Sequence, residues 1–596
     1  MRYKLDNVAA PWLESYGEVA PNLDYSEKTI SEAVLERAAQ EGDFPALTFM
    51  GKATSYTRLA AEIDRVARAF YALGVRPGTR VLVCLPNVPQ AVFCLYGLNR
   101  IGAIPTMVHP LSAVAELAFF MNEADCEMAV TLDQFYAKFQ EVKKDRPVRK
   151  LIVCRVSDEL PWLLSMGQKL LTERKFPKVE GEGDILWNDF LKLAESIPAE
   201  SGDSRSRPGM SGRPGMTGKP GMTGTSYVAT KDYRSEAVVL FSGGTTGTTK
   251  GIMLSDLNFN ALAWQTANMA NQEVHHSKML AAMPVFHGFG LGVCIHTLMF
   301  IGGTSILVPR FNVKSYAKLI RKTRPNFIAG VPTLFEAITR NRYLDGADLS
   351  CLRGVFSGGD SLTIELKKKF DQFLAEHNAS VRVREGYGTT ECVTACCLTP
   401  YNKEKEGSIG IPFPDTYFKV CKPGTTEEIP YGEEGEICLT GPSMMLGYIG
   451  HEEENAQTLR KHADGHVWLH TGDLGMMDSE GFVYFRQRIK RMIVTSGYNV
   501  YPSQLENIIE GHPAVQRSCV IGVKDPLKMQ RVKAFIVLKD NCPKDDDMRE
   551  SIMKHCRANI AKYALPSEIE FRDSLPTTLV GKVAYTQLEK EEAQKA

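Results

Sequence analysis

Apolar residues near the N-terminus recur at the spacing of a helix that buries one face. In the segment 59–73 they stand every three or four positions, which places them on one side of an α-helix. The turn VRPGT follows and leads into RVLVCLP, an apolar run whose length predicts a buried strand. A helix followed by a short strand recurs in 90–108, 113–132 and 316–332. This repetition predicts an α/β fold with parallel sheets covered by helices.

The segment from Pro284 to Pro309 carries no Asp, Glu, Lys or Arg and approaches the ~20 residues of a membrane span. Gly302 and Gly303 divide it into a helix-like half, LGVCIHTLMF, and a β-rich half, TSILVP. That division is typical of a buried helix, a turn and a strand in an α/β core. We therefore predict no integral membrane span here.

Two changes of composition divide the chain. Residues 207–224 repeat the hexapeptides RPGMSG, RPGMTG and KPGMTG, which offer no apolar periodicity, so we expect a flexible exposed insertion at about 202–226. After Phe485 the basic segment RQRIKR leads into short alternating elements. We therefore predict an N-terminal domain at 1–486 and a small α+β C-terminal domain at 487–596.

Charge and cysteine content exclude several classes of partner. Lys plus Arg (70) equal Asp plus Glu (70), so no overall field favours nucleic acid or an anionic membrane. The fourteen cysteines form no CxxC pair and are interpreted as reduced thiols. The N-terminal residues lack a signal-peptide pattern. We expect a cytoplasmic protein whose anion sites are local, and its oligomeric state stays open.

One glycine-rich loop is a strong candidate for such a site. Residues 237–255, AVVLFSGGTTGTTKGIMLS, run from an apolar strand into a loop of Gly, Ser and Thr. Bare backbone amides, hydroxyl groups and one ammonium form a cradle for a nucleotide phosphate. The GxxxxGK[ST] motif of P-loop proteins does not fit, because Thr249 precedes the lysine and Gly251 follows it. The expected phosphate-binding residues are Ser242, Gly243, Gly244, Thr245, Thr246, Gly247, Thr248, Thr249 and Lys250.

Further motifs follow this loop in order. They are SGGDS at 357–361, EGYGTTE at 385–391, WLHTGD at 468–473, RIKRMIVTSGYNVYP at 488–502 and PTTLVGKV at 576–583. Together with the loop they resemble, over nearly the whole chain, the adenylate-forming superfamily of acyl-CoA synthetases, aryl-CoA ligases, luciferases and nonribosomal adenylation domains. The resemblance implies a large N-terminal domain with a small β-barrel-like subdomain, and a small mobile C-terminal domain.

The resemblance also assigns residues to the nucleotide. Glu391 would hold Mg²⁺ through a hard carboxylate oxygen, Thr390 would bind the α-phosphate, and Tyr387 would offer an aromatic face to the base. An ionised Asp473 at a strand end would accept hydrogen bonds from the ribose. The expected adenine- and ribose-binding residues are Gly359, Asp360, Ser361, Glu385, Gly386, Tyr387, Gly388, Thr389, Asp473 and Arg488.

The C-terminal motifs imply catalysis in two conformations. Lys582 matches the catalytic lysine that bridges the substrate carboxylate and the α-phosphate. Lys490 matches the hinge about which the C-terminal domain rotates, and Gly497 and Tyr498 would then contact coenzyme A.

Two residues beside the hinge depart from the family pattern. Gln487 stands where glycine is frequent, and Arg491 stands where an acidic residue is common. These departures concern the details of the hinge and leave the chemistry unchanged.

An acyl pocket is expected beside the nucleotide. His287 matches a gating position of the family and is also counted among the catalytic candidates. Small, soft side chains after Glu391 suggest an apolar tunnel, which favours a fatty or similarly hydrophobic acid. The expected lining residues are His287, Gly330, Val331, Gly358, Val393 and Cys396.

Three histidines raise the alternative of a zinc site. His462, His466 and His470 stand at helical spacing. The Asp464-Gly465 pair between them predicts a turn and VWLHT predicts a strand. We therefore expect no zinc site.

These residues predict an acid–thiol ligase that uses ATP, Mg²⁺ and coenzyme A. A hydrophobic acid would form an acyl-AMP and then an acyl-CoA, releasing pyrophosphate and AMP. An aryl or other carboxylate substrate, or a carrier-protein thiol as acceptor, stays open. A non-catalytic relative is disfavoured because Lys250, Glu391, Asp473 and Lys582 are all present.

Overall fold

The computed structural model describes residues 1–171, 176, 178–199, 226–242, 249–270, 274–495, 498–525, 529–578 and 582–595. The predicted insertion at about 202–226 lies almost entirely outside the described residues.

An eight-stranded sheet contains the first helix–strand units. Its order is β19-β9-β8-β4-β3-β5-β6-β7, and the strands from β8 to β7 run parallel. The predicted strand RVLVCLP is its central strand β3. The strands are β3 Arg80–Cys84, β4 Ile104–Met107, β5 Met128–Leu132, β6 Lys150–Cys154, β7 Asp184–Leu186, β8 Glu236–Phe241, β9 Gly251–Ser255 and β19 Gly447–Tyr448.

A nine-stranded sheet lies beside it, with the order β16-β15-β14-β13-β12-β10-β11-β1-β2. In this sheet β14, β13, β12, β10, β11 and β1 run parallel to one another. The strands at the two edges pair antiparallel, β2 with β1 at one edge and β15 with β14 and β16 at the other. The strands are β1 Pro45–Phe49, β2 Lys52–Ser55, β10 Lys278–Ala281, β11 Thr304–Leu307, β12 Phe327–Gly330, β13 Gly354–Ser357, β14 Val383–Tyr387, β15 Cys397–Leu398 and β16 Ile411–Pro412.

Helices cover these sheets through apolar faces. In α2 the residues predicted to share one face, among them Leu59, Ile63, Val66 and Phe70, are fully buried, and Ser55 caps its first turn by accepting from the Arg58 amide. The helices of this part are α1 Ile30–Glu41, α2 Tyr56–Ala72, α3 Pro89–Arg100, α4 Val114–Glu123, α5 Tyr136–Asp145, α6 Trp162–Leu171, α7 Trp187–Lys192, α8 Asp256–Met269, α9 Thr297–Ile301, α10 Val313–Thr323, α11 Pro332–Thr339 and α12 Ile364–Glu376.

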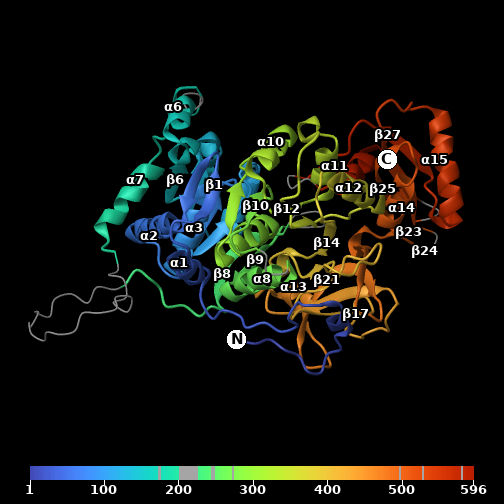
Figure 1. Ribbon diagram of the computed structural model, residues 1–596, viewed down its shortest axis with the longest axis horizontal. Coiled ribbons are helices and arrows are strands. Elements are labelled where there is room, and N and C mark those ends of the chain that lie inside the picture. The colour runs from blue at the N-terminus through green and yellow to red at the C-terminus, as the bar shows by residue number, and fades with distance from the viewer. Residues whose placement is uncertain are drawn as a thin grey trace, which may run out of the picture.

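Two smaller sheets complete the molecule. The first has the order β17-β18-β21-β20 with β22 on β21, and the second has the order β24-β23-β26-β25 with β27 on β26. Figure 1 shows the second at one end of the molecule with α14 and α15, far from β1 and β6. The elements are β17 Tyr417–Cys421, β18 Gly435–Thr440, α13 Glu452–Thr458, β20 Leu459–Lys461, β21 Val467–Met477, β22 Val483–Arg488, β23 Ile493–Thr495, β24 Tyr498–Val500, α14 Pro502–Glu510, β25 Val515–Asp525, β26 Met529–Leu538, α15 Asp546–Asn559, β27 Glu568–Arg572 and α16 Tyr585–Lys595.

The predicted fold class is confirmed, with one local difference in the apolar segment. A buried helix, a glycine turn and strand β11 follow one another as expected, but Phe289–His296 forms a π-helix ahead of α9. These eight residues, apolar except for His296, carry too little periodicity to separate a π-helix from an α-helix. Within the described chain, no helix is long and apolar enough to cross a membrane.

Candidate active site

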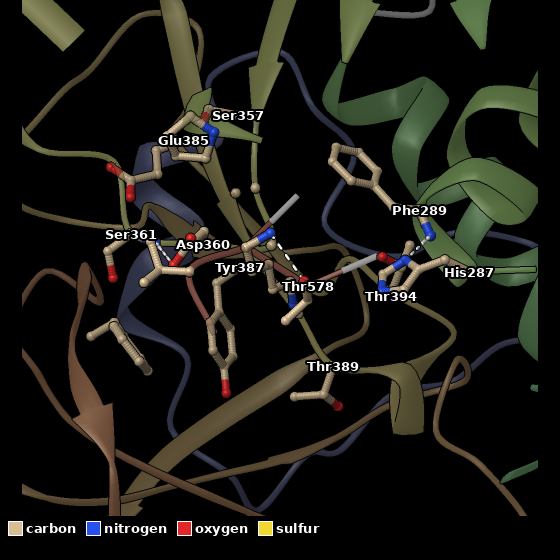
Figure 2. Close-up of a pocket in the computed structure, with 18 of the residues that line it drawn as sticks. His287, Phe289, Ser357, Asp360, Ser361, Glu385, Tyr387, Thr389, Thr394 and Thr578 are labelled. Carbon is tan, nitrogen blue, oxygen red and sulfur yellow. Dashed lines mark hydrogen bonds between the residues drawn. The ribbon is translucent and has the colours of Figure 1, made fainter. Parts of the chain in front are cut away.

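A cavity of about 1050 Å³ lies where parallel strands β13 and β14 end and the C-terminal elements approach. Carboxyl ends of parallel strands are the usual place for a ligand in such sheets. Figure 2 shows His287 and Phe289 on one side of the cavity and Asp360 and Ser361 on the other, with Tyr387 between them. The predicted residues that line it include Ser242, Thr249, Gly358, Gly359, Asp360, Ser361, Glu385, Gly386, Tyr387, Gly388, Thr389, Thr390, Glu391, Asp473, Arg488 and Lys582.

Asp473 lies between two polar side chains, those of Tyr387 and Arg488. The Tyr387 hydroxyl donates to its Oδ2 over 2.6 Å, and Arg488 Nε lies 3.5 Å from its Oδ1. Burial raises the pKa of Asp473, while Arg488 and Tyr387 oppose that rise. Asp473 lies inside β21 instead of at a strand end, so this detail of the prediction is wrong. The left-handed Gly472 (φ 70°) and the irregular pairing at Leu474 and Gly475 bend the strand there.

Two positions at the cavity favour glycine, Gly388 because another chain segment approaches closely and Gly359 because its backbone is left-handed. A Cβ at Gly388 would lie 1.4 Å from the Thr394 carbonyl oxygen, so no other residue fits without moving the backbone. Gly359 has a φ of 81°, and a Cβ there would lie 3.6 Å from Lys582 Cε. The lysine side chain therefore runs along the backbone of the glycine-rich loop after β13.

Lys582 reaches the cavity from the connection between β27 and α16. Thr578 N donates to the Lys582 carbonyl over 2.7 Å, and Lys582 N donates to Thr578 Oγ1 over 3.1 Å. Burial lowers the pKa of Lys582, while Asp360 acts in the opposite direction. These bonds fix the base of the side chain, so its ammonium group is directed into the cavity.

Glu391 enters from the loop after β14. Its Oε1 accepts a hydrogen bond of 2.9 Å from Tyr448 OH. Next to it, Thr389 Oγ1 is buried without a hydrogen-bond partner among the described residues. This corner of the cavity therefore offers hard oxygen atoms to a cation or a phosphate-bound metal.

Only the two ends of the predicted phosphate loop are described, because Gly243, Gly244, Thr245, Thr246, Gly247 and Thr248 lie outside the described residues. Ser242 N donates to the Lys250 carbonyl over 3.1 Å, and Lys250 N donates to Ser242 Oγ over 3.1 Å. Lys250 Nζ pairs with Glu454 Oε1 at 3.3 Å. The closed base of the loop brings Ser242 and Thr249 to the cavity wall.

His287 lies at the apolar end of the cavity. Its Nδ1 accepts from the Phe289 amide over 3.2 Å. Burial, reinforced by Lys582, lowers its pKa to about 3. His287 is therefore a neutral imidazole at neutral pH and is not a general acid there.

The predicted acyl pocket is only partly reproduced. His287 and Gly358 line the cavity, while Gly330, Val331, Val393 and Cys396 are buried behind its lining. Residues 393–396 lie between regular elements, so the alternation of apolar residues in the sequence does not predict which of their side chains face the cavity. The apolar lining residues include instead Phe286, Phe289, Val293, Ala395, Cys397 and Phe413.

The sequence matches known proteins over almost its whole length. It matches the AMP-binding enzyme family at residues 34–449 and the AMP-binding enzyme C-terminal domain at 504–582. The chain belongs to the AMP-binding enzymes. Among its relatives, the long-chain-fatty-acid–CoA ligase of Bacillus subtilis is 32% identical over 98% of both chains. The ligase of the same name from Escherichia coli is 30% identical over 97% of this chain and 98% of its own.

A solved structure has the same fold. The anthranilate CoA ligase AuaEII in complex with anthranoyl-AMP has a TM-score of 0.80 and 21% identity, over 96% of this chain and 98% of its own. The resemblance inferred from the motifs is therefore confirmed at the level of family and fold.

The structure of the predicted hinge segment shows how the two unusual residues of this AMP-binding enzyme are accommodated. Lys490 is exposed in the connection after β22. Arg491 Nη2 pairs with Glu506 Oε1 at 2.5 Å. The guanidinium group of Arg491 also lies over the Tyr585 ring, with Cζ 4.7 Å from the ring centroid. Burial alone would lower the pKa of Arg491, but Glu506 outweighs it and the net shift is upward. Gln487 is buried and lines the cavity.

The residues assigned to coenzyme A are only partly visible. Gly497 lies outside the described residues, and Tyr498 is described as backbone of β24.

Several residues at the site were not predicted. Tyr448 reaches Glu391 because β19 pairs with β9. Arg517 on β25 of the C-terminal sheet approaches Glu336 on α11 (4.0 Å) and Asp360 in the loop after β13 (3.9 Å). Isolated polar residues in ordinary elements carry no sequence signal for such contacts.

The three histidines at 462, 466 and 470 do not converge on one point. His462 Nε2 and His470 Nε2 are 2.9 Å apart, whereas His466 Nε2 lies 2.9 Å from Asn7 Oδ1. As predicted, Gly465 is in a turn and His470 is in strand β21.

Proposed function

We propose that this enzyme activates a hydrophobic carboxylic acid with ATP and transfers the acyl group to coenzyme A. The observation that carries the proposal is the meeting of Lys582, the Asp473–Arg488 pair and Glu391 in one cavity, although they come from separate parts of the chain. The relatives named as long-chain-fatty-acid–CoA ligases, matched over nearly full length, support a fatty acid as the substrate.

In the first step, the acid carboxylate would attack the α-phosphorus of ATP and release pyrophosphate. A carboxylate is a weak nucleophile toward a polyanion, so alignment and charge neutralisation supply most of the catalysis. Lys582 would hold the carboxylate against the α-phosphate with its ammonium group. Asp473 and Arg488 would bind the ribose, and the loop ending at Lys250 would bind the leaving phosphates.

The donor set around Glu391 fits a magnesium ion carried by the nucleotide. The Glu391 carboxylate and the unpaired Thr389 hydroxyl are hard oxygen ligands. When bound, Mg²⁺ would neutralise phosphate charge and stabilise the departing pyrophosphate. Thr390 would donate to the α-phosphate from the same loop.

In the second step, the coenzyme A thiol would displace AMP from the acyl-AMP. Lys582 occupies the approach to the reacting centre, so it must withdraw first. The connection between β22, which ends at Arg488, and β23, which begins at Ile493, contains the exposed Lys490. We assign the hinge to Lys490, with domains at 1–486 and 487–596, and we assign contacts with coenzyme A to Gly497 and Tyr498.

The apolar end of the cavity favours a fatty acid over a charged acid. Phe286, Phe289 and Val293 present apolar surface beside the neutral His287. A charged side chain buried there would lack a partner.

We also propose a cytoplasmic location. The free cysteines, most of them buried, are consistent with it.

Pyrophosphate release with a panel of fatty, aryl and dicarboxylic acids tests the proposal. We expect release with long-chain fatty acids and multiple turnover only when coenzyme A is added. Preference for an aryl acid would replace the proposed substrate class. Turnover with a phosphopantetheine-bearing carrier protein but not with coenzyme A would replace the proposed acceptor.

A further inference from the structure

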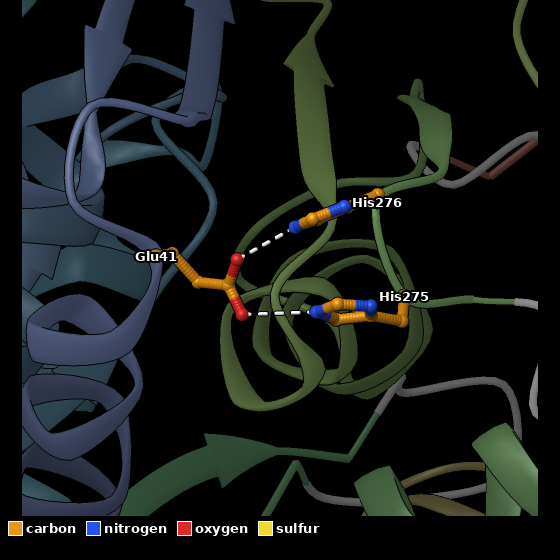
Figure 3. A group of neighbouring side chains, drawn as sticks. All are labelled: Glu41, His275 and His276. Carbon is orange, nitrogen blue, oxygen red and sulfur yellow. Dashed lines mark hydrogen bonds and ion pairs between the residues drawn. The ribbon is translucent and has the colours of Figure 1, made fainter.

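Three side chains outside the lining of the active-site cavity converge at the surface. Glu41 is the last residue of α1, and His275 and His276 precede β10. His275 Nε2 lies 2.9 Å from Glu41 Oε1, and His276 Nε2 lies 2.7 Å from Oε2. Figure 3 shows the two imidazoles side by side, each directed at one oxygen of the same carboxylate.

The backbone brings these adjacent histidines to one side. Consecutive residues in extended chain point in opposite directions, but His276 adopts a left-handed φ of 55°. The two rings therefore stack, with centroids 3.9 Å apart and planes at 24°. Phe44 stacks on the outer face of His276 at 4.2 Å. A strained backbone conformation and an aromatic support thus hold both Nε2 atoms toward Glu41.

We propose that Glu41, His275 and His276 form a binding site for a divalent late transition-metal ion, with zinc as the expected occupant. Two imidazole nitrogens and a carboxylate are a typical zinc ligand set, with solvent completing the coordination. The three ligand atoms lie within 4.8 Å of one another. Two ligand atoms about 2.1 Å from one ion are about 3.4 Å apart at the tetrahedral angle, so small movements of the histidines suffice.

The surroundings favour a cation and allow it to enter. Glu41 stands at the C-terminal end of a helix, where the helix dipole attracts positive charge. The histidine side chains are 51% exposed and Glu41 is 8% exposed. An ion can therefore approach from the histidine side and meet a carboxylate that both imidazoles already face.

A neighbouring glycine keeps space for the site. A Cβ at Gly302 would lie 2.5 Å from Glu41 Oε1 and 2.9 Å from His275 Cδ2. Arg37 Nη1, at 3.5 Å from Glu41 Oε1, is a competing cation.

A bound ion would tie the end of α1 to the turn before β10, and each imidazole would keep its proton on Nδ1. The site would therefore stabilise the N-terminal part without joining the reaction.

Zinc binding to the tag-free, chelator-treated full-length protein tests this site by calorimetry and metal analysis. We expect one Zn²⁺ to bind at micromolar or tighter affinity, to raise the melting temperature, and to be replaced by Co²⁺ with a visible absorption band. Glu41→Gln, which keeps a hydrogen-bond acceptor, and His275→Asn should each weaken Zn²⁺ binding at least about tenfold. Acyl-CoA formation should stay unchanged in both.

His555→Asn, a change to a histidine that contacts a backbone carbonyl, is the matched control. It should bind Zn²⁺ as the wild type does. Unchanged Zn²⁺ affinity in both site variants would overturn the proposal, as would the absence of Zn²⁺ binding to the wild type. Either result would leave the three residues as an ion-pair cluster only.

Discussion

We propose Lys582 as the residue on which the first half-reaction depends most directly. Its side chain runs along Gly359 in the wall of the cavity. We expect Lys582→Ala to lower acyl-AMP formation about 10²-fold or more, because a transition-state contact is lost. Conversion of supplied acyl-AMP to acyl-CoA should be largely retained. Equal losses in both half-reactions, measured separately, would contradict the assigned role.

His287 contributes a neutral imidazole rather than a titrating group. Because its pKa is about 3, it stays unprotonated at every pH from about 5 upward. The pH–rate profiles of the wild type and His287→Asn should therefore differ in height but not in shape. If an ionisation near neutral pH disappeared in the variant, His287 would be a proton carrier.

His296 allows a test of stability against pH. It is fully buried between Tyr96 OH (3.0 Å) and Asn260 Oδ1 (3.1 Å), and burial lowers its pKa to about 3. The unfolded chain then binds more protons than the folded chain below about pH 6.5, so stability falls as the pH falls. The free energy of unfolding that this histidine contributes falls by up to about 1.4 kcal/mol per pH unit.

The corresponding measurement is the urea midpoint between neutral and mildly acidic pH. His296→Gln should be less stable than the wild type at neutral pH but should show a flatter decline. His555→Gln serves as the control and should decline as the wild type does. A slope unchanged in His296→Gln would mean that this histidine is not the group responsible.

At the scale of elements, the loop after β14 depends on a residue without a side chain. Gly388→Ala would place a methyl group 1.4 Å from the Thr394 carbonyl oxygen. We expect destabilisation of about 3 kcal/mol or more and loss of adenylation, because the backbone must move. Gly167→Ala meets nothing within 4 Å and is the neutral comparison. Equal melting temperatures for the two variants would show that this loop is not tightly packed.

The regular elements follow from the sequence more fully than the site does. The face of α2 and strand β3 were predicted because burial imposes a period on apolar residues. The nucleotide motifs were predicted because their residues, in order along the chain, resemble those of a known enzyme family. By contrast, the π-helix and the acyl lining depend on packing between distant segments, and Tyr448 reaches Glu391 through sheet pairing. Such contacts leave no local pattern.

At the scale of the whole molecule, the packing of the C-terminal elements brings Lys582 to the side of the cavity that we assign to the nucleotide. Arg517 helps to hold the C-terminal elements in this position through its ion pairs with Glu336 at 4.0 Å and Asp360 at 3.9 Å. Partly exposed ion pairs contribute about 1 kcal/mol or less, so Arg517→Ala should slow adenylation by about three- to fivefold. Thioester formation from supplied acyl-AMP should be unaffected. Arg549→Ala, which removes a pair within α15, should change neither rate.

The central claim is that one cavity forms an acyl-AMP and then passes the acyl group to coenzyme A. Its most direct test is mass spectrometry of the enzyme mixed with a long-chain fatty acid, ATP and Mg²⁺, first without and then with coenzyme A. The account predicts bound acyl-AMP, about one per enzyme, which becomes acyl-CoA and AMP after the thiol is added. In Lys582→Ala the acyl-AMP should form at least about 10²-fold more slowly. Acyl-CoA formation with ADP as the product, or without any acyl-AMP, would contradict it.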